Sequence, residues 1–284
     1  MDLPVVRAIC CHGLLPGPLT YDKTPGTIIC AQALSNRDKL CRSSTRAAGL
    51  HRCGLSSQAN QSMAPVKVFG SAVFANAARV MACLEEVGVE YEVVEVDYMA
   101  REHKGLKHLA RNPFGQIPAF QDGDIMLFES RAISKYVLRK YAKSAQDDLL
   151  REGNPEEAAM VDAWTEVEAH HYFPAMAPIF YECVVYPARL GTVPDQKIVG
   201  ESLEKLRKVL DVYEAHLSRT KSKYLAGNFF SFADLNHFPF TFHIMTATPH
   251  ASLFDSYPHI KAWWARVMAR PSLKKISTHM EIKP

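Results

Sequence analysis

The chain has 284 residues, of which 48% are hydrophobic and 22% charged, and its formal net charge is +3. This length and this apolar content are enough for one large domain or two ordinary domains with hydrophobic cores. The balanced charge, without runs of Lys or Arg, excludes the usual pattern of a nucleic-acid-binding surface. No stretch reaches the ~20 apolar residues of a membrane-spanning helix. We therefore expect neither nucleic acid nor a membrane as a partner.

Residues 1–62 differ in composition from the rest of the chain. They contain five of the seven cysteines, show no sustained hydrophobic period and become rich in Ser and Arg in their second half, where Asp38 is the one acidic residue. We expect an extension without folded structure. Two explanations stay open. Acid-poor, Arg/Ser-rich segments resemble organelle transit peptides, and the extension is equally explained as an upstream reading of a gene whose natural start is Met63.

The cysteines show neither a CxxC pair nor a spacing typical of zinc ligands. This usage favours a reducing compartment, where thiols stay free. The histidines give no metal pattern either, because His170 and His171 are adjacent and diverge by about 100° on a helix. We expect no metal site in this protein.

Residues 63–143 change between strand and helix periods, in an order typical of a thioredoxin-like α/β domain. The expected elements are a strand at Val66–Phe69, a helix with an apolar face from Ala77 to Val87 that stops at Gly88, a strand at Tyr91–Val96, an irregular charged stretch at 97–110, a hairpin and a final helix.

The hairpin and the final helix of this domain are predicted from residues 111–137. Pro118 begins a strand at a position where a missing N–H is tolerated, and Asp122-Gly123 predicts a two-residue turn before the return strand. Ser130 is expected to be the N-cap of the helix, because apolar residues follow it at helical spacing.

Residues 144–153 are polar and are expected to form a linker. Residues 154–284 show helical spacing and no strand pattern, which predicts an all-α domain. Pro174 and Pro178 should kink or interrupt its first long helical stretch, and its last helix should stop near Pro271. Two helix starts carry capping signatures with a structural role, Asn154 ahead of Pro155 and Ser231 with Asp234 three residues later.

Three short segments together resemble the glutathione transferase family, and in particular its plant phi class. They are Glu102-His103-Lys104, the run from Arg111 to Pro118 and the run from Leu127 to Ile133. They fall in order at consistent spacing, and the resemblance covers residues 63–284. It implies the glutathione transferase fold, in which a thioredoxin-like domain precedes an all-α domain. It also implies a cytoplasmic homodimer that uses glutathione as cosubstrate and has no covalently bound cofactor. The alternative location is the plastid, if the extension is a transit peptide.

The resemblance also implies which residues hold glutathione. A cis peptide bond before Pro118 would turn the backbone of Ile117 toward the cysteinyl part, which it would pair like an added strand. A helix N-terminus favours a carboxylate, which suits Ser130 for the γ-glutamyl end. The other implied contacts are Glu129 at the ammonium region, His103 and Lys104 as positive donors to the glycyl carboxylate, and Gln116 beside the central peptide.

One position departs from the phi-class pattern. In such relatives a serine just before the first helix donates a hydrogen bond to the glutathione thiolate, and the matching residue here is Phe74, which has no donor. The nearest substitutes are Ser71 and Asn76. A hydrogen bond to a charged group contributes roughly 1.5–3 kcal/mol, so its loss would weaken thiol activation without abolishing it, because the N–H groups of the helix remain.

Two functions therefore stay open. The first is an enzyme of detoxification and stress response that conjugates glutathione to apolar electrophiles or reduces organic hydroperoxides. The second is a glutathione-dependent carrier of apolar ligands with little turnover. In either case the electrophile or ligand is expected in an apolar pocket near Phe74. The candidates to line it are Tyr172, Phe173, Ile179, Phe180 and Tyr181.

Overall fold

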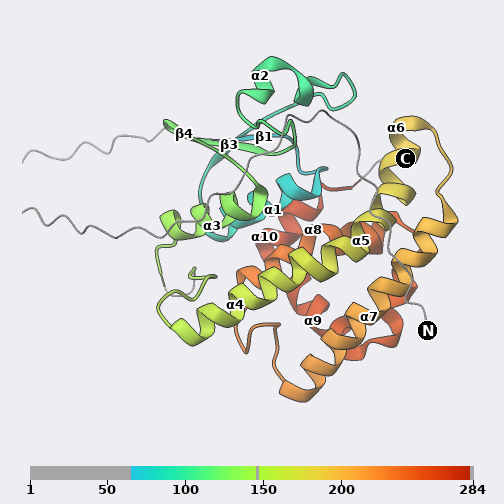
Figure 1. Cartoon of the computed structure of the whole chain (residues 1–284). Helices are drawn as coiled ribbons and strands as arrows, with labels where there is room; N and C mark the ends of the chain where they lie inside the picture. Colours follow the sequence, from blue (N-terminus) through green and yellow to red (C-terminus); the bar gives the residue numbers. More distant parts are fainter. Residues whose placement is uncertain (1–64, 145–146, 282–284) are drawn as a thin grey trace, which may run out of the picture. The chain divides into compact units, whose positions relative to one another are not determined.

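The computed structural model describes residues 65–144 and 147–281, so the expected extension at residues 1–62 lies outside the described residues. The described residues belong to one compact unit. Within it, an α/β part is followed by a helical part (Figure 1), which confirms the predicted fold class. None of the described helices combines the length and the apolar composition that a membrane crossing requires.

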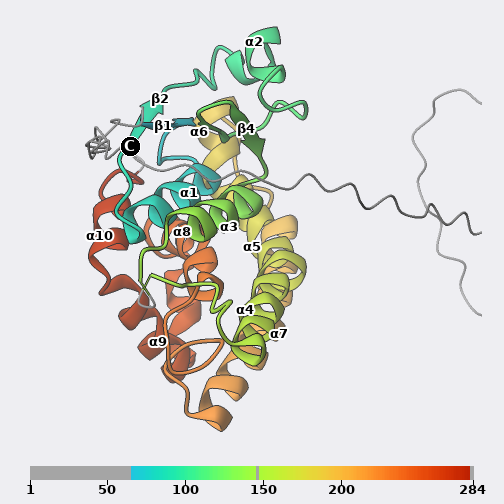
Figure 2. The same ribbon diagram turned by 90° about the vertical axis from the view of Figure 1, so that its left-hand side faces the viewer.

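The α/β part is built on a four-stranded sheet with the order β2-β1-β3-β4. β1 and β2 are parallel, and the other two pairs are antiparallel. Helices α1 and α3 pack side by side on one face of the sheet, while α2 lies beyond the other face (Figure 2). This is the predicted thioredoxin-like arrangement. Its elements are β1 (Val66–Phe69), α1 (Ala75–Glu86), β2 (Tyr91–Val94), the 3-10 turn η1 (Glu102–Lys104), α2 (Leu106–Leu109), β3 (Ala119–Asp122), β4 (Ile125–Phe128) and α3 (Ser130–Tyr141).

The hairpin turn lies one residue later than predicted. Asp122 pairs with Ile125 as the last rung of the β3–β4 ladder, so the turn residues are Gly123 and Asp124. The carboxylate of Asp122 explains the shift. It is buried and accepts hydrogen bonds from Tyr136, Lys140 and Tyr141 of α3, which hold the residue in the strand.

The helical part begins at the predicted N-cap. The Asn154 side chain accepts from the N–H groups of Glu156 and Glu157. Helical structure then continues from 155 to 190, although an interruption was expected at Pro174 and Pro178. The π-helical turns η2 and η3 directly precede α5 and α6, so Pro174 and Pro187 lie in first turns, where a missing N–H costs little. This stretch comprises α4 (Pro155–Val167), η2 (Glu168–Tyr172), α5 (Phe173–Phe180), η3 (Tyr181–Val185) and α6 (Tyr186–Leu190).

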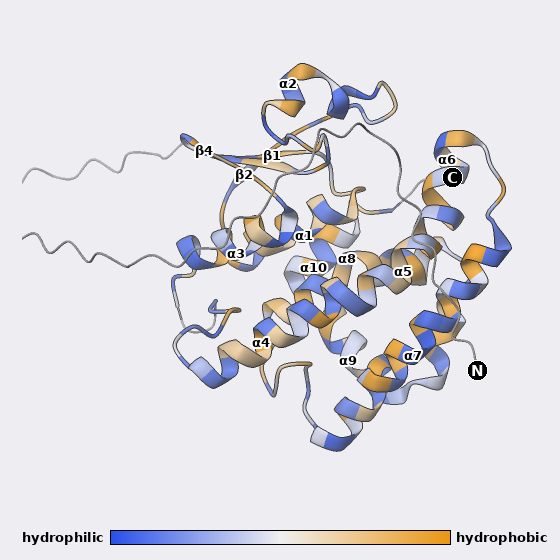
Figure 3. Cartoon of the chain, in the orientation of Figure 1, coloured by the Kyte–Doolittle hydropathy of each residue, from blue (hydrophilic) through white to orange (hydrophobic). Residues whose placement is uncertain are grey.

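Helix α8 forms the centre of the helical part, with every residue from Phe232 to Ile244 buried. The predicted link between Ser231 and Asp234 is present, because the Asp234 carboxylate accepts from the backbone N–H and the hydroxyl of Ser231. Figure 3 shows mixed blue and orange turns along α7, as expected for a helix with one buried face. The remaining elements are α7 (Gln196–Thr220), α8 (Phe232–Ala247), the 3-10 turn η4 (Ala251–Ser256), α9 (Pro258–Met268) and α10 (Pro271–Ser277).

Two segments of the helical part differ from expectation. Helix α9 stops at Met268, near Pro271 as predicted, but a further helix that was not predicted, α10, begins at Pro271, because proline is well suited to a first helical position. The stretch expected to be a polar linker is partly packed. Leu149 and Leu150 are buried, and the carbonyl of Leu149 accepts from the N–H of Phe232 at 2.9 Å.

The joint between the two parts is α1, which packs against both α3 and α8. Just before it, Gly70 has φ +125°, and a Cβ at this position would lie 2.3 Å from Cγ2 of Ile117. The glycine therefore lets the Ile117–Pro118 segment, whose peptide bond is cis as the resemblance implied, pack directly against β1. This contact brings the loop before β3 to the start of α1.

The folded protein should lose stability in mild acid because of two buried histidines. Burial lowers the pKa of His237 and of His243 to about 4, whereas an unfolded histidine titrates near ~6.5. The unfolded chain thus binds more protons between these values. We expect the stabilising contribution to be complete above pH ~6.5 and to fall as the pH drops toward 4, by about 2 kcal/mol for each histidine between pH 7 and pH 5.

Urea denaturation at pH 7, 6 and 5 measures this loss of unfolding free energy. His243→Phe should remove about half of the histidine-dependent slope, and His171→Gln, at an exposed histidine, should leave it unchanged. An equal pH dependence in wild type and His243→Phe would contradict the prediction.

Candidate functional site

The start of α1 offers unpaired backbone donors. Phe74 is the N-cap of this 12-residue helix and has an extended backbone without a side-chain cap. Its own N–H donates to the carbonyl of Ser71 at 3.1 Å, but the N–H groups of Ala75 and Asn76 have no partner among the described residues. Such free N–H groups, together with the helix dipole, favour an anion at this point.

The two substitute donors suggested for Phe74 differ in their surroundings. The Oδ1 atom of Asn76 accepts from Arg79 at 2.5 Å and from Ser130 at 3.3 Å. The Nδ2 atom of Asn76 is left without a partner in the described part of the chain, so it remains a donor at the start of α1. Ser71 instead lines a groove of about 1330 Å³ that extends to α10.

The start of α3 lies next to the start of α1. The N-cap of α3 is Glu129, with φ 68°, and Ser130 is its first residue, so the prediction of Ser130 as N-cap was wrong by one position. The reason lies in the partners of the hydroxyl. Ser130 Oγ accepts from Arg79 at 2.7 Å and donates to Asn76, instead of capping its own helix. The Glu129 side chain is exposed beside it.

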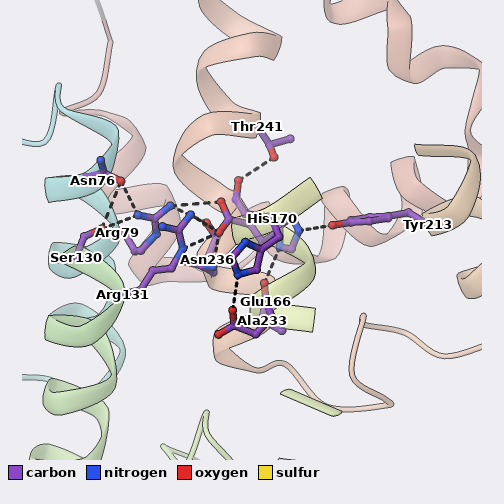
Figure 4. A network of polar contacts seen from close by, with 12 residues as sticks. Asn76, Arg79, Ser130, Arg131, Glu166, His170, Tyr213, Ala233, Asn236 and Thr241 are labelled. Carbon is purple, nitrogen blue, oxygen red and sulfur yellow. Dashed lines mark hydrogen bonds and ion pairs between the residues drawn. The ribbon is translucent and has the colours of Figure 1, made fainter. Parts of the chain in front are cut away.

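A buried carboxylate holds these two helix starts against the helical part. Arg79 and Glu168 are both fully buried, and Nη2 of Arg79 lies 3.5 Å from Oε1 of Glu168. Glu168 Oε2 accepts from Nη2 of Arg131 at 2.6 Å and from Nδ2 of Asn236 at 2.6 Å (Figure 4). We call Asn76, Arg79, Ser130, Arg131, Glu168 and Asn236 the Glu168 network.

The charges of Arg79 and Glu168 compensate each other in the buried Glu168 network. Burial lowers the pKa of Arg79 to about 10, while Glu168 acts in the opposite direction, so the guanidinium stays charged at neutral pH. Two arginines face one carboxylate, which leaves a net positive charge close to Ser130. This charge supports the binding of an anionic group at the start of α3.

A second group of predicted residues lies around the loop before Pro118. Lys104 Nζ donates to the carbonyl of Phe114 at 3.0 Å. The carbonyl of Gln116 lies 2.9 Å from Nε2 of His108 and accepts from Nδ2 of Asn112 at 2.9 Å, whereas the Gln116 side chain is exposed. Gly115 (φ +57°) makes the close packing possible, because a Cβ there would lie 2.8 Å from the carbonyl oxygen of His103.

His103 differs from the expectation of a positive donor. It is buried, and its ring stacks on Tyr98 with the centroids 4.4 Å apart. Burial lowers the pKa of His103, and the nearby cations Lys104 and Arg189 lower it further. Both effects favour the uncharged imidazole over the positive donor that was expected. The positive charge of this group comes from Lys104.

The aromatic surroundings of Phe74 come partly from other residues than predicted. Phe74 and Tyr98 contact each other with ring centroids 5.4 Å apart. Burial and the hydroxyls of Tyr98 and Tyr186 raise the pKa of Tyr181, which places these three side chains near one another. Of the five predicted pocket residues only Tyr181 is exposed, at 39%. Tyr172, Ile179 and Phe180 are buried, and Phe173 packs against Phe240.

Of the Glu168 network, only Asn76 and Ser130 were predicted from the sequence, and Tyr98 and Arg189 were not predicted. One signal was present, because Glu168 lies between Trp164 and Tyr172 at four-residue spacing and so shares their buried face. Among residues 65–144 and 147–281, no group of three His, Cys, Asp or Glu side chains could hold a metal ion.

The chain matches two family models, described as the glutathione S-transferase N-terminal domain over residues 64–139 and the C-terminal domain over residues 172–271. It is 67% identical over 218 residues to the Oryza sativa subsp. japonica protein named probable glutathione S-transferase GSTF1, covering 77% of this chain and 98% of the relative. It is also 55% identical over 222 residues to glutathione S-transferase 1 of Triticum aestivum, covering 77% of this chain and 96% of the relative.

Solved structures agree with these sequence matches. Glutathione transferase F7 from Populus trichocarpa superposes with a TM-score of 0.73 at 48% identity, over 76% of this chain and all of that chain. A glutathione S-transferase-I bound with lactoylglutathione gives a TM-score of 0.71 at 53% identity, over the same shares of the two chains.

Removing the central carboxylate should be strongly destabilising. In Glu168→Gln the buried Arg79 and the partly exposed Arg131 lose their counterion, and breaking a buried ion pair from one side costs about 3–5 kcal/mol. Urea denaturation measures this loss. The matched control is Glu166→Gln, two residues earlier, where the carboxylate and its partner His170 are both exposed and a change below about 1 kcal/mol is expected. Equal effects of the two substitutions would contradict a central role of Glu168.

Proposed function

The chain belongs to the phi class of the glutathione transferase family, and we propose that it transfers glutathione to apolar electrophiles. The observation that carries this proposal is the start of α1. The N–H groups of Ala75 and Asn76, which have no partner in the part of the chain that the structure describes, lie there next to Ser130 and the charged Glu168 network. The starts of α1 and α3 lie side by side, and each favours an anion. Together they suit a substrate that has a carboxylate at one end and a thiolate in its middle.

The proposed binding mode follows the two groups of residues. Ser130 Oγ, held by Arg79, would turn its O–H from Asn76 to the γ-glutamyl carboxylate, with Glu129 at the ammonium region. The backbone of Ile117 would pair with the cysteinyl part, with Gln116 beside it. Lys104 as a cation and His103 as a neutral donor would bind the glycyl carboxylate. These roles are supported by the side-by-side packing of α1 and α3 and by the contact of Gly70 with Ile117.

The thiolate would be stabilised without a hydroxyl group. Free N–H groups at a helix start lower the pKa of a thiol, and the Nδ2 atom of Asn76 adds a further donor. The sulfur then attacks the electrophilic carbon, a C–S bond forms, and the leaving group departs with the bonding electrons. With an organic hydroperoxide the sulfur attacks the distal oxygen instead, an S–O bond forms, the O–O bond breaks and the alkoxide leaves as the alcohol after taking up a proton. The sulfenic acid of glutathione then reacts with a second glutathione to give the disulfide and water. Phe74 and Tyr98 would contact the apolar body of either substrate.

The carrier function is the weaker candidate. The absence of a hydroxyl at Phe74 favours it, but the backbone donors at Ala75 and Asn76 remove its main support. The relatives in the comparisons bear the names of transferases, which also favours turnover.

The proposed form of the protein is a homodimer in the cytoplasm. Phe114, Ile125, Met126 and Met160 are apolar and between 36% and 64% exposed, which suits a surface that a second copy covers. Light scattering on the full chain distinguishes a dimer from a 31.8 kDa monomer.

The free thiols of Cys83 and Cys183 suit a reducing compartment. A fluorescent fusion of the full chain shows whether it enters the cytosol or the plastid.

Ultraviolet titration of bound glutathione tests the proposed thiol activation. The wild type should hold the thiol with a pKa clearly below the ~8.5 of a free thiol. Phe74→Ser should lower the pKa by about 1–2 further units, because one hydrogen bond to a charged group contributes roughly 1.5–3 kcal/mol. The rate with a neutral aryl chloride at pH 6.5 should rise in parallel.

Phe74→Ala is the matched control, since it removes the ring without adding a donor and should not lower the thiol pKa. A wild type that binds glutathione with an unshifted thiol and turns over no aryl chloride would support the carrier and contradict the proposal.

A further inference from the structure

Arg189 is held beside the aromatic cluster by a residue of the α/β part. Its Nη1 donates to the hydroxyl of Tyr98 at 3.2 Å, and its guanidinium carbon lies 4.9 Å from the centroid of the Tyr98 ring. Tyr98 in turn contacts Phe74. Tyr98 thus contacts both Arg189 and the residue that takes the place of the family serine.

The charge of Arg189 is not neutralised within the described residues, because it forms no ion pair there. No carboxylate oxygen of the described residues lies within 4.0 Å of its guanidinium nitrogens. A guanidinium has five N–H donors, and Tyr98 uses one of them.

The two faces of the Tyr98 ring separate two sites of positive charge. His103 stacks on one face at an interplanar angle of 15°, so Arg189 lies over the other face. The His103 side is the one expected to bind the glycyl carboxylate of glutathione. Arg189 comes from α6, and Tyr181 and Tyr186 precede it in the helical part that is expected to contact the electrophile.

We propose that Arg189, positioned by Tyr98, is a specificity-determining residue that binds an anionic group, such as a carboxylate, on the electrophile. This inference rests on the proposed function and narrows its substrate class to aromatic electrophiles that carry an acid. The planar guanidinium fits a carboxylate with two parallel hydrogen bonds. The Tyr98 ring and Phe74 provide apolar contact for the aromatic body of the same molecule.

Two aryl chlorides test the proposal, 4-chloro-3,5-dinitrobenzoate and its uncharged methyl ester. In both, the glutathione sulfur attacks the carbon that bears chlorine, the C–S bond forms, the C–Cl bond breaks and chloride leaves. The ester activates the ring more strongly than the carboxylate, so the two rates are not compared directly. Recognition of the charge is read from the ratio of kcat/KM between variant and wild type for each substrate, in which the intrinsic reactivity cancels.

We expect Arg189→Gln in the full chain to lower kcat/KM for the acid about 10-fold, as for the loss of one charged hydrogen bond, and to leave the ester within about twofold. Tyr98→Phe keeps the ring but removes the hydroxyl that positions Arg189, and should lower kcat/KM for the acid about threefold. Arg219→Gln, an exposed arginine at the end of α7, is the charge-matched control and should change neither substrate.

Equal losses on acid and ester, or a raised KM for glutathione with no discrimination between them, would overturn the inference while leaving the proposed transferase intact. If the wild type converts neither aryl chloride, the proposed function itself fails, and the inference falls with it. Circular dichroism and the melting temperature of each variant exclude unfolding as the cause of a loss.

Discussion

The ion pair between Arg79 and Glu168 is the constraint on which the rest of the site depends. A charge without a counterion is very costly to bury, and here a carboxylate from the helical part lies between Arg79 of α1 and Arg131 of α3. The pair gives α1, α3 and η2 one relative position, and Asn236 ties it to α8. The hydroxyl of Ser130 and the amide of Asn76 are oriented as a consequence.

The same constraint explains how an unusual residue is accommodated at Phe74. With the helix start held in place by Arg79 and Asn76, the proposed thiol binding uses backbone N–H groups instead of a side-chain hydroxyl at position 74. These N–H groups are directed along the helix axis whichever side chain stands at position 74. The phenyl ring instead contacts Tyr98, which also positions Arg189. Phenylalanine in place of the family serine thus removes a hydrogen-bond donor. It adds an aromatic surface on the side where the electrophile is proposed to bind.

Features that depend on neighbours in sequence were predicted well. The capping residues Asn154 and Ser231, the strand that follows Pro118 and the order of elements in the α/β part all rest on local turn, cap and period signals. The cis bond before Pro118 came from the family resemblance and is present. The prolines of the first long helical stretch were misjudged, because π-helical turns that no local pattern indicates place two of them in first turns.

Several residues of the site were predicted from the sequence, but the contacts between them were not. Ser130 was assigned the correct helix start, yet its partner Arg79 is distant in sequence, and no local pattern shows that a charged residue of α1 is buried. His103 was expected to be charged, whereas burial under Tyr98 favours the uncharged imidazole. In both cases the deciding factor is a contact made by tertiary packing, which acts after the local signals have been read.

A crystal structure of the full chain with bound glutathione tests the central claim most directly, which is that the start of α1 holds the thiolate without a hydroxyl. We predict the sulfur within about 3.5 Å of the backbone nitrogen of Ala75 or Asn76, with the γ-glutamyl carboxylate on Ser130 Oγ and Arg79 still donating to that hydroxyl. A sulfur bound to the hydroxyl of Ser71, or directed away from the start of α1, would contradict the account.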